Sequence, residues 1–376
     1  MFHVKRATPP GLGFLDGALA GAKERDLLRE RPPPTDGRPL SFCSNDYLGL
    51  AAEQAPPEAA GAGASRLVTG DRPIHARLEE AAAELVGQPA ALVFTSGYAA
   101  NVGLMSALAG PGDLVVSDAL NHASIIDGAR LSRARVEVVP HLDGGAVETT
   151  LRGRTEGRAF VVTESYFSMD ADAPDLAALR RVCDQHGAAL LVDEAHALGV
   201  LGPEGRGLCA EAGVEADAVV GTFGKAFGAG GAFVAGCPAL VAWLWNRARS
   251  FVFSTGLSPT VAAAALQGLH LAHAQPERRC RVLAAATLLR DGMVRLGVQP
   301  AGFGHILPWV LGEPGRALRM ATALRERGLD VRAIRPPSVP SGTARIRLTV
   351  TAAHGSTDIE QALADLAAVL APGTPE

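Results

Sequence analysis

The sequence predicts an α/β fold, in which a mostly parallel sheet covered by helices on both faces is followed by a smaller α+β unit. Three observations support this prediction. Short apolar runs alternate with helical segments between residues 90 and 220, most of these runs end in polar residues, and the rhythm stops after Ser258-Pro259. Strands that alternate with helices form parallel sheets, and strands buried on both faces read as continuous apolar runs.

The first part of the chain comes before this rhythm. Residues 15 to 30 have the periodicity of an amphipathic helix, which Pro32-Pro33-Pro34 would end. Residues 41 to 50 predict a short strand that runs into a polar turn, residues 61 to 70 a glycine-rich loop, and residues 77 to 85 a helix. We expect residues 1–44 to form an N-terminal segment of helix and strand.

The strands of the main sheet are expected at the apolar runs 90–94, 114–116, 136–139, 159–162, 188–192 and 218–220. A further run, residues 226–246, carries no charge and is long enough to suggest a membrane span. It also contains Gly228, Gly230, Gly231 and Pro238, which would break a single helix. We therefore expect a buried strand followed by the start of a helix, within a large domain over residues 45–260.

The pattern changes after residue 260. It predicts helices at 260–274 and 277–296, strands at 307–310, 329–334 and 345–350, and a final helix at 358–370. This order indicates a smaller α+β domain over residues 261–376. A chain of 376 residues is long enough for two such domains.

Composition argues against several classes of partner. The net charge of -4 gives no electrostatic basis for binding nucleic acid or an anionic membrane, and 5% aromatic residues offer few platforms for stacking bases. The five cysteines are scattered without a C-x-x-C pair, so neither a disulfide framework nor a zinc ribbon is predicted. We recognise no secretory signal and expect a cytoplasmic protein.

A lysine and an aspartate follow neighbouring strands of the predicted sheet. Lys225 lies between the run 218–220 and a glycine cluster, with no carboxylate within six residues. Burial away from a counter-charge lowers the pKa of an amine and makes it a usable Schiff-base former. Asp193 ends the run 188–192, and a buried carboxylate can keep a pyridinium nitrogen protonated, so that the ring accepts electrons. An amine and an acid on adjacent strand ends are what a pyridoxal enzyme needs.

These residues also have ordinary structural interpretations. Lys225 could be a surface lysine of a glycine-rich loop, and Asp193 could cap the next helix with His196 in the core. Ser96-Gly97-Tyr98 follows a strand and opens a helix, which suits a phosphate group but is also a common form of helix N-cap.

Polar residues follow several of the predicted strands. They are Ser96, His122, Ser168, Asp193, His196, Thr222 and Lys225. In open α/β sheets ligands bind beyond the carboxyl ends of the strands, so this fold would bring these side chains to one edge. A metal site is not expected, because the pair His270-x-x-His273 lacks a third ligand nearby.

The residues that match a known family are spread along nearly the whole chain. They are Ser44 to Leu50, Gly63 to Arg66 with Thr69-Gly70, His75-x-x-Leu78-Glu79, Ser96 to Asn101, Asn121 to Ser124, Thr163 to Asp170, Asp193 to His196 and Thr222 to Lys225. In this combination the chain resembles the pyridoxal-phosphate α-oxoamine synthases. The resemblance implies the fold-type I transferase scaffold, with a mostly parallel seven-stranded sheet in the large domain and a smaller α+β C-terminal domain.

The resemblance also implies roles for the matching residues. Lys225 forms the Schiff base with pyridoxal 5'-phosphate and later removes the Cα proton, while Asp193 pairs with the pyridinium nitrogen. His196 bonds to the phenolic oxygen of the ring and His122 stacks on its face. The implied cofactor-binding set is Ser96, Gly97, Tyr98, His122, Ser168, Asp193, His196, Thr222, Lys225 and Thr255, in which Lys225, His122, Asp193 and His196 are catalytic.

The resemblance further implies where substrates and a second subunit bind. The implied substrate-binding set is Arg29, Asn45, His122, Arg335 and Ser338, with Arg335 on the amino-acid carboxylate. A bidentate guanidinium suits a carboxylate better than lysine does. Ser254-Thr255 matches a segment that reaches the phosphate from the neighbouring subunit, which implies a homodimer with shared active sites.

Residues 334–348 are most similar to the biotin-pathway member of the family. That member condenses L-alanine with a pimeloyl thioester, so the resemblance implies L-alanine and pimeloyl-CoA or pimeloyl carrier protein as substrates. Two alternatives stay open: a sister synthase that uses glycine or serine with another acyl-CoA, and a catalytically silent homologue. The presence of Asp193, His196, Lys225 and Arg335 argues against the silent homologue.

Overall fold

The computed structural model describes residues 14–29, 40–53 and 55–371. Its larger sheet has seven strands in the order β2-β8-β7-β6-β5-β3-β4. They are β2 (Ala90–Phe94), β3 (Asp113–Asp118), β4 (Arg135–Val139), β5 (Arg158–Glu164), β6 (Ala189–Asp193), β7 (Ala218–Thr222) and β8 (Ala232–Gly236). In this sheet β8 runs antiparallel to both of its neighbours and the other pairs are parallel, so the predicted mostly parallel seven-stranded sheet is confirmed.

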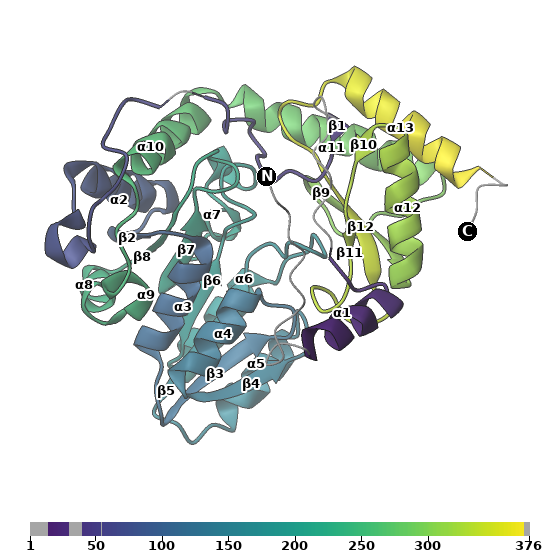
Figure 1. Ribbon diagram of the computed structural model, residues 1–376. Helices are drawn as coiled ribbons and strands as arrows, with labels where there is room; N and C mark the ends of the chain where they lie inside the picture. The colour runs from purple at the N-terminus through teal and green to yellow at the C-terminus, as the bar shows by residue number, and fades with distance from the viewer. Residues whose placement is uncertain (1–13, 30–39, 54, 372–376) are drawn as a thin grey trace.

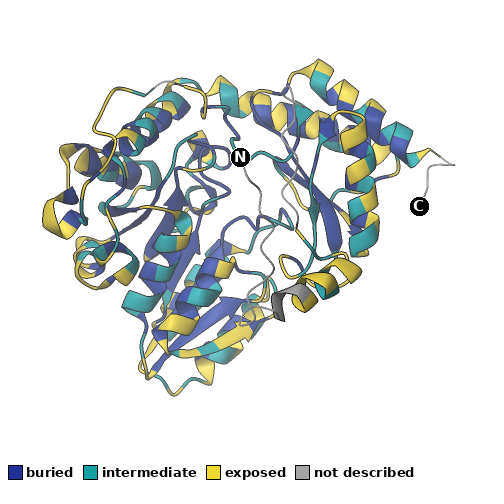
Figure 2. Cartoon of the chain, in the orientation of Figure 1, coloured by how far each residue is buried: buried dark blue, intermediate teal, exposed yellow. Residues whose placement is uncertain are grey.

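Both faces of this sheet are covered, as its continuous apolar runs predict. Successive residues of β6 pack into different hydrophobic clusters, Leu190 and Val192 into one and Leu191 into the other. Figure 2 shows the strands buried, while the surrounding helices expose their outer faces. A sheet buried on both sides leaves its strand ends as the places where polar side chains can gather.

The helices around the larger sheet begin and end where the sequence supplies caps. Ser96 caps α3 by accepting a hydrogen bond from the N–H of Ala99 at 3.1 Å, and Gly187 ends α6 in the left-handed conformation. These helices are α2 (Pro73–Val86), α3 (Gly97–Leu108), α4 (Ala123–Ser132), α5 (Gly144–Arg152), α6 (Leu176–His186), α7 (Leu208–Ala212), α8 (Pro238–Arg247) and α9 (Arg249–Val252), with the short turns η2 (Arg66–Gly70) and η3 (Pro203–Gly205).

A second sheet follows in the C-terminal part of the chain and lies beside the first (Figure 1). It is antiparallel, in the order β11-β12-β9, and consists of β9 (Ile306–Gly312), β11 (Ala333–Ile334) and β12 (Ala344–Thr349). The helices of this part are α10 (Pro259–Ala274), α11 (Glu277–Arg295), α12 (Pro314–Glu326) and α13 (Ser356–Leu370). Val282 of α11 packs in the core of the larger sheet and Leu289 in that of the smaller one, so this helix joins the two.

The described part of the N-terminal segment around β1 packs against the core of the second sheet. Strand β1 (Leu40–Ser41) pairs in parallel with β10 (Leu329–Asp330), and Phe42 packs into the same hydrophobic cluster as α13. The domain bounds at residues 44 and 260 stay predictions.

The structure differs from the predicted elements near the N-terminus and at residues 329–334, which form two short strands, β10 and β11, in different sheets. The helix expected to reach residue 30 is α1 (Phe14–Glu24), which ends just before Asp26, a residue with a φ of 55°. The short strand expected to begin at residue 41 is the two-residue strand β1. The carboxylate of Asp46 accepts hydrogen bonds from the N–H groups of Leu50 (2.9 Å) and Ala51 (3.1 Å), which forms the polar turn expected after the strand.

The uncharged run 226–246 forms β8 and the start of α8, as predicted. Among the described residues, no helix has both the length and the hydropathy that a membrane crossing needs.

Candidate active site

Three polar side chains come from the carboxyl ends of adjacent parallel strands. Glu164 is the last residue of β5 and pairs in register with Asp193, the last residue of β6. β7 is the next strand, and Lys225 follows its last residue, Thr222, by three positions. The predicted adjacency of Asp193 and Lys225 on neighbouring strand ends therefore describes the sheet correctly.

Asp193 is a buried carboxylate that is held by neutral donors. The side-chain amide of Asn101 donates to Oδ2 at 2.7 Å, and the N–H of Ala195 donates to Oδ1 at 2.9 Å. Asp193 is 7% exposed, and among the described residues no cation lies within ion-pair distance of it. A buried carboxylate without a cation is costly, so this group is poised to receive a positively charged partner.

The amine of Lys225 is affected by the charges around it. Burial lowers the pKa of Lys225 to about 8, although the negative charges of Asp193 and Glu164 act in the opposite direction. The positive charge of Arg347 lowers it further. An amine with this pKa is about one-tenth deprotonated at pH 7, a far larger fraction than an ordinary lysine has, and the deprotonated form is the one that attacks a carbonyl group.

Glu164 is a site residue to which the sequence analysis assigned no role. It is 4% exposed, and burial together with the negative charge of Asp193 raises its pKa to about 8. Backbone N–H groups of His122 and Ser168 act against this rise. The signal was present in the sequence, because Glu164 ends an apolar run just as Asp193 does.

His196 is buried and forms a hydrogen bond with Tyr47. Its Nδ1 lies 2.7 Å from the hydroxyl of Tyr47, which is itself fully buried. Burial lowers the pKa of His196 well below its ordinary value, and the charges of Lys225 and Arg347 add to this effect. His196 is therefore a neutral imidazole at physiological pH.

His122 presents an exposed ring at the N-terminus of α4. Its Nδ1 accepts a hydrogen bond from the N–H of Ser124 at 3.2 Å and thereby caps the helix. Desolvation lowers the pKa of His122, the charge of Asp193 raises it, and the charge of Lys225 lowers it. These effects place His122 in the same electrostatic cluster as Asp193 and Lys225.

The N-terminus of α3 lies beside the end of β7. A Cβ added to Gly97 would come within 3.9 Å of the Cβ of Thr222, so the first turn of the helix faces that strand end. Ser96 is exposed, and so is Tyr98, whose hydroxyl donates to Asp127. The hydroxyl of Thr222 donates to the carbonyl of Gly231 at 3.1 Å and accepts from the N–H of Gly224 at 3.2 Å.

Ser168 lies in a loop that both sheets hold in place. Arg347 on β12 donates to the carbonyl of Ser168 at 2.6 Å, and Arg345 donates to the carboxylate of Asp170 at 2.6 Å. On the other side, His141 lies 2.8 Å from Asp118 and 3.2 Å from Asp172. The loop is thus fixed to the larger sheet by one cation and to the smaller sheet by two.

The predicted substrate residues form a second group at the smaller sheet. Arg29 donates to the hydroxyl of Ser338 at 2.9 Å, and Arg335 donates to the carbonyls of Asp26 and Leu28. Asn45 accepts a hydrogen bond from Arg347 at 3.1 Å. Arg347 is 7% exposed and its charge affects Lys225, so it is the guanidinium group that the sequence analysis missed.

Thr255, the predicted contact with a neighbouring subunit, is exposed in a loop after α9. It lines a small cavity together with Thr95 and Arg66 of its own chain.

These residues fit pyridoxal phosphate. The buried carboxylate of Asp193, which is held by neutral donors, suits a protonated ring nitrogen, and the amine of Lys225 suits an aldehyde. The exposed ring of His122 offers a flat surface, and the N-terminus of α3, a helix of 12 residues, suits a phosphate. The donor set therefore matches each part of that molecule.

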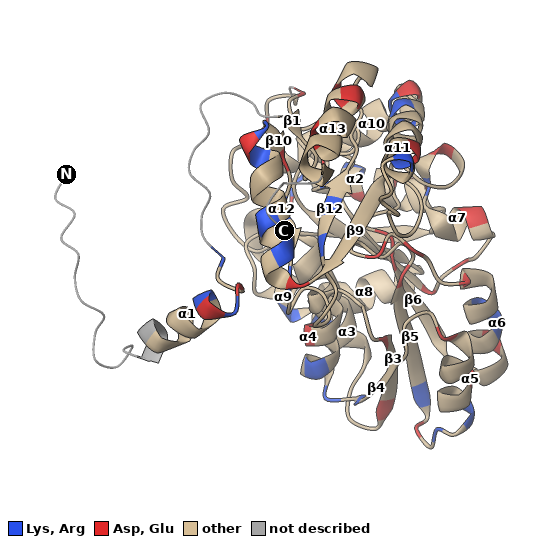
Figure 3. Cartoon of the chain, turned by 90° about the vertical axis from the view of Figure 1, so that its right-hand side faces the viewer, with Lys and Arg blue, Asp and Glu red and all other residues tan. Residues whose placement is uncertain are grey.

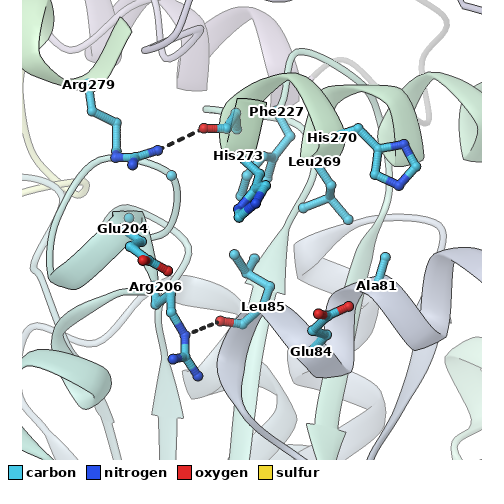
Figure 4. A pocket seen from close by; sticks show the side chains of 13 residues that line it. Ala81, Glu84, Leu85, Glu204, Arg206, Phe227, Leu269, His270, His273 and Arg279 are labelled. Carbon is cyan, nitrogen blue, oxygen red and sulfur yellow. Dashed lines mark hydrogen bonds between the residues drawn. The ribbon is translucent and has the colours of Figure 1, made fainter. Parts of the chain in front are cut away.

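A separate cavity of about 400 Å³ lies between α2, α10 and the loop 199–206 (Figure 4). His270 and His273 line it with Arg206 and Arg279, and none of the predicted site residues does so. Within the described ranges, no group of three or more His, Cys, Asp or Glu residues is placed to hold a metal ion.

In Figure 3 both Lys or Arg and Asp or Glu occur on the helices that carry charges, as on α11. This agrees with the small net charge of -4.

Comparisons with known proteins show which family the chain resembles over most of its length. The family model for aminotransferase class I and II matches residues 38–366. The chain is 50% identical over 347 residues to an 8-amino-7-oxononanoate synthase of Anaeromyxobacter dehalogenans, covering 89% of this chain and 87% of that one. It is 45% identical to an 8-amino-7-oxononanoate synthase of Marinobacter nauticus, with 92% of each chain covered.

Two solved structures are similar in fold. The structure of serine palmitoyltransferase (SPT) with its PLP internal aldimine superimposes with a TM-score of 0.88 at 29% identity, covering 95% of this chain and 97% of that one. An 8-amino-7-oxononanoate synthase of Francisella tularensis superimposes with a TM-score of 0.74 at 26% identity, covering 89% of this chain and 98% of that one.

Proposed function

The chain belongs to the aminotransferase class I and II family, and we propose that it condenses L-alanine with a pimeloyl thioester to form 8-amino-7-oxononanoate, CO2 and the free thiol. It is a transferase that depends on pyridoxal phosphate. The observation that carries the proposal is the complete Lys225 and Asp193 site in a chain 50% identical over 347 residues to an 8-amino-7-oxononanoate synthase.

The residues of the chain would hold the cofactor at each of its ends. Lys225 would bond to its aldehyde, Asp193 would bind the ring nitrogen, and the first turn of α3 from Ser96 to Tyr98 would bind its phosphate. When bound, pyridoxal phosphate supplies an electron sink that stabilises negative charge at the Cα of the amino acid.

The chemistry left to the protein is proton transfer and orientation. The Nζ of Lys225 accepts the Cα proton of alanine, because its pKa of about 8 lies near the working pH and makes the unprotonated amine accessible. Asn101 orients the carboxylate of Asp193, and His122 covers one face of the site. The acyl group then transfers to Cα as the thiol leaves, and loss of CO2 completes the reaction.

Two arginines could bind the carboxylate of alanine. Arg335 is the residue that the family resemblance points to, but its donors already bond to the carbonyls of Asp26 and Leu28. Arg347 lies among Asn45, Tyr47 and Ser168, and its charge affects Lys225. Each arginine is changed in turn to Lys, and KM for alanine is measured. Replacement of the arginine that binds the carboxylate should raise KM at least tenfold, which assigns the role.

A substrate panel tests the function. The purified holoenzyme is assayed for thiol release with alanine, glycine and serine against pimeloyl-, acetyl-, succinyl- and palmitoyl-CoA, and pimeloyl carrier protein is added as a further donor. We expect alanine with a pimeloyl donor to give the highest kcat/KM. Faster turnover of glycine with acetyl-CoA would instead indicate a 2-amino-3-ketobutyrate CoA ligase, and a protein that takes up no cofactor would be a silent homologue.

One observation favours a second candidate within the same panel. The structural similarity to SPT, at a TM-score of 0.88, is higher than that to the Francisella tularensis synthase, at 0.74. Serine with palmitoyl-CoA is therefore the substrate pair in the panel that tests the proposal most directly. The higher sequence identity to 8-amino-7-oxononanoate synthases, 50% against 29%, favours alanine and the pimeloyl donor.

We also propose that the protein is a cytoplasmic homodimer that acts in biotin biosynthesis. Phe253 and Val68 are each 73% exposed, and their two segments are joined by a hydrogen bond from the N–H of Gly256 to the carbonyl of Ala64 at 3.0 Å. Large exposed apolar side chains beside Thr255 suit a subunit interface. The five free cysteines are compatible with a reducing compartment.

Mixing two inactive variants tests the shared site. Lys225→Ala removes the amine, and Thr255→Asp places a negative charge where the neighbouring phosphate is expected. If sites are shared, a mixed dimer contains one site with both residues intact, so activity returns on mixing. A mixture that stays inactive would contradict the shared site.

A further inference from the structure

We infer that Tyr47 is a positioning residue that fixes the tautomer of His196: its hydroxyl donates to Nδ1, which leaves the ring proton on Nε2 to be donated within the active site. The inference deepens the proposed function, because His196 belongs to the same site. Its spectroscopic tests do not depend on which amino acid or thioester the enzyme uses.

The contacts around the hydroxyl of Tyr47 are short and buried. It lies 2.7 Å from Nδ1 of His196 and 3.2 Å from Oδ1 of Asn45, and Nη2 of Arg347 donates to it at 3.3 Å. Tyr47 is 0% exposed and His196 is 7% exposed. Water is therefore kept away, and the hydrogen-bond direction is decided by these side chains alone.

Arg347 determines the direction of the hydrogen bond between the hydroxyl of Tyr47 and Nδ1 of His196. A guanidinium group can only donate, so the phenolic oxygen must accept from it. Oδ1 of Asn45 already accepts from Nη1 of Arg347 at 3.1 Å, so it does not need the proton of Tyr47. The shorter distance, 2.7 Å to Nδ1 of His196, marks the preferred acceptor.

The reverse arrangement is electrostatically poorer. It would point the N–H of Nδ1 at an oxygen that already faces the positive charge of Arg347. The same charge makes the phenol a stronger donor. Burial and the nearby charges of Lys225 and Arg347 keep the imidazole of His196 neutral, so it carries one proton. With Nδ1 accepting, that proton is on Nε2.

Three distant parts of the chain meet at this hydroxyl. Tyr47 follows β1, His196 follows β6 of the larger sheet, and Arg347 is on β12 of the smaller sheet. The tautomer of His196 is therefore set only when the smaller sheet is docked. Whether Nε2 of His196 carries the proton therefore depends on how the two sheets pack against each other.

The first test reads the tautomer of the unmodified holoenzyme. A two-bond ¹H–¹⁵N correlation spectrum of protein labelled at histidine separates protonated from unprotonated ring nitrogens, and the His196 signals are those missing in His196→Asn. We expect Nε2 protonated and Nδ1 unprotonated. A protonated Nδ1 would overturn the inference, and this measurement needs no variant of Tyr47 that might fail to fold.

The second test uses Tyr47→Phe with Tyr166→Phe as the matched control. Tyr166 is also buried, but its hydroxyl donates to the carbonyl of Phe303 and does not contact His196. A donor at Nε2 stabilises negative charge on the oxygen that it binds. Tyr47→Phe should remove this donor. The visible absorption of the holoenzyme changes with pH, and we expect the midpoint of that change to rise by about one pH unit.

The kinetic expectation separates positioning from general damage. In Tyr47→Phe we expect kcat to fall about tenfold, with KM for both substrates nearly unchanged. In Tyr166→Phe the absorption midpoint, the His196 spectrum and kcat should stay as in the unmodified enzyme. If both variants behave alike, or if Tyr47→Phe leaves the absorption midpoint unmoved, Tyr47 does not set the tautomer.

Discussion

The side-chain amide of Asn101 on α3 holds Oδ2 of Asp193 at 2.7 Å and also donates to the hydroxyl of Ser124 at 3.0 Å. It thus ties the helix whose N-terminus suits a phosphate to the carboxylate that suits a ring nitrogen. Because a single amide orients Asp193 from α3, the two ends of the cofactor site are linked through one helix.

Replacing Asn101 with Leu should weaken cofactor binding. The variant keeps the side-chain volume but removes the donor to a buried charge, a contact worth about 1.5–3 kcal/mol. The Kd for pyridoxal phosphate, measured by fluorescence titration of the apoprotein, should rise about 10- to 100-fold. Asn246→Leu on the exposed face of α8 is the control and should leave Kd unchanged. Equal Kd values for the two variants would contradict the role of Asn101.

The reactivity of Lys225 should depend on pH with a midpoint of about 8 rather than its ordinary 10.5, because burial lowers its pKa. Above this midpoint the amine is unprotonated and nucleophilic. The rate at which the apoprotein takes up pyridoxal phosphate, followed by visible absorption, should rise with pH through about 8. Lys225→Ala should form no such absorption and show no turnover.

Glu164→Gln should shift this midpoint downward, because the negative charge of Glu164 raises the pKa of Lys225. The control is Glu156→Gln, since Glu156 pairs with Arg135 away from the site. An unchanged midpoint in Glu164→Gln would show that the two groups are not coupled.

His141 should stabilise the fold in a pH-dependent way. Burial disfavours its charged form, but hydrogen bonds with Asp118 and Asp172 outweigh burial and raise its pKa to about 10. The folded pKa lies above the ordinary 6.5, so the stabilisation is complete below about pH 6.5 and is lost as pH rises through about 10. His141→Gln should therefore lower the free energy of unfolding by about 2 kcal/mol in mild acid and by much less above pH 10.

Urea denaturation at several pH values measures this difference. His270→Gln on the exposed end of α10 is the control, and its effect should not vary with pH in the same way. A difference between His141→Gln and the unmodified protein that is constant across the range would contradict the charged bridge.

Gly228 should tolerate no side chain, because of what lies against it. Its φ is +64°, and an added Cβ would come within 2.4 Å of the carbonyl carbon of Leu50. Gly213 has a similar φ of +62° with open space around it. Gly213→Ala should cost about 1 kcal/mol from backbone strain alone. Gly228→Ala should cost about 3 kcal/mol or more, since it also pushes apart two backbone segments.

Thermal unfolding of the two variants, with the Kd for pyridoxal phosphate, measures the contrast. Gly228 follows Lys225 by three residues, so displacement of this loop should also weaken cofactor binding. Equal losses of stability in the two variants would mean that the contact with Leu50 is not tight.

The positions of Asp193 and Lys225 could be predicted because each follows a continuous apolar run. In a parallel sheet the residues that follow each apolar run lie at the carboxyl ends of the strands. Because a helix separates one run from the next, these ends lie at the same edge of the sheet. Glu164 carried the same signal. The structure places it in register with Asp193, so it is a third polar residue at the same edge of the sheet.

Arg347 and Tyr47 could not be predicted in the same way. Alternation along β12 suggests that Arg345 and Arg347 face solvent, as arginines on one side of a strand usually do. They are buried because that side of β12 faces the loop containing Ser168, which comes from the larger sheet. A contact between two sheets leaves no periodic signal in either segment. Tyr47 bonds to both sheets for the same reason.

The pairing of Leu40 with Leu329 sets an order of events during synthesis of the chain. All seven strands of the larger sheet are complete by Gly236, so that sheet can assemble while the ribosome is still translating the C-terminal third. The backbone groups of β1 cannot form their strand hydrogen bonds until Leu329 has been synthesised and has left the ribosome. The smaller sheet, and with it Arg347 and the donor state of His196, is therefore the last part of the enzyme to be finished.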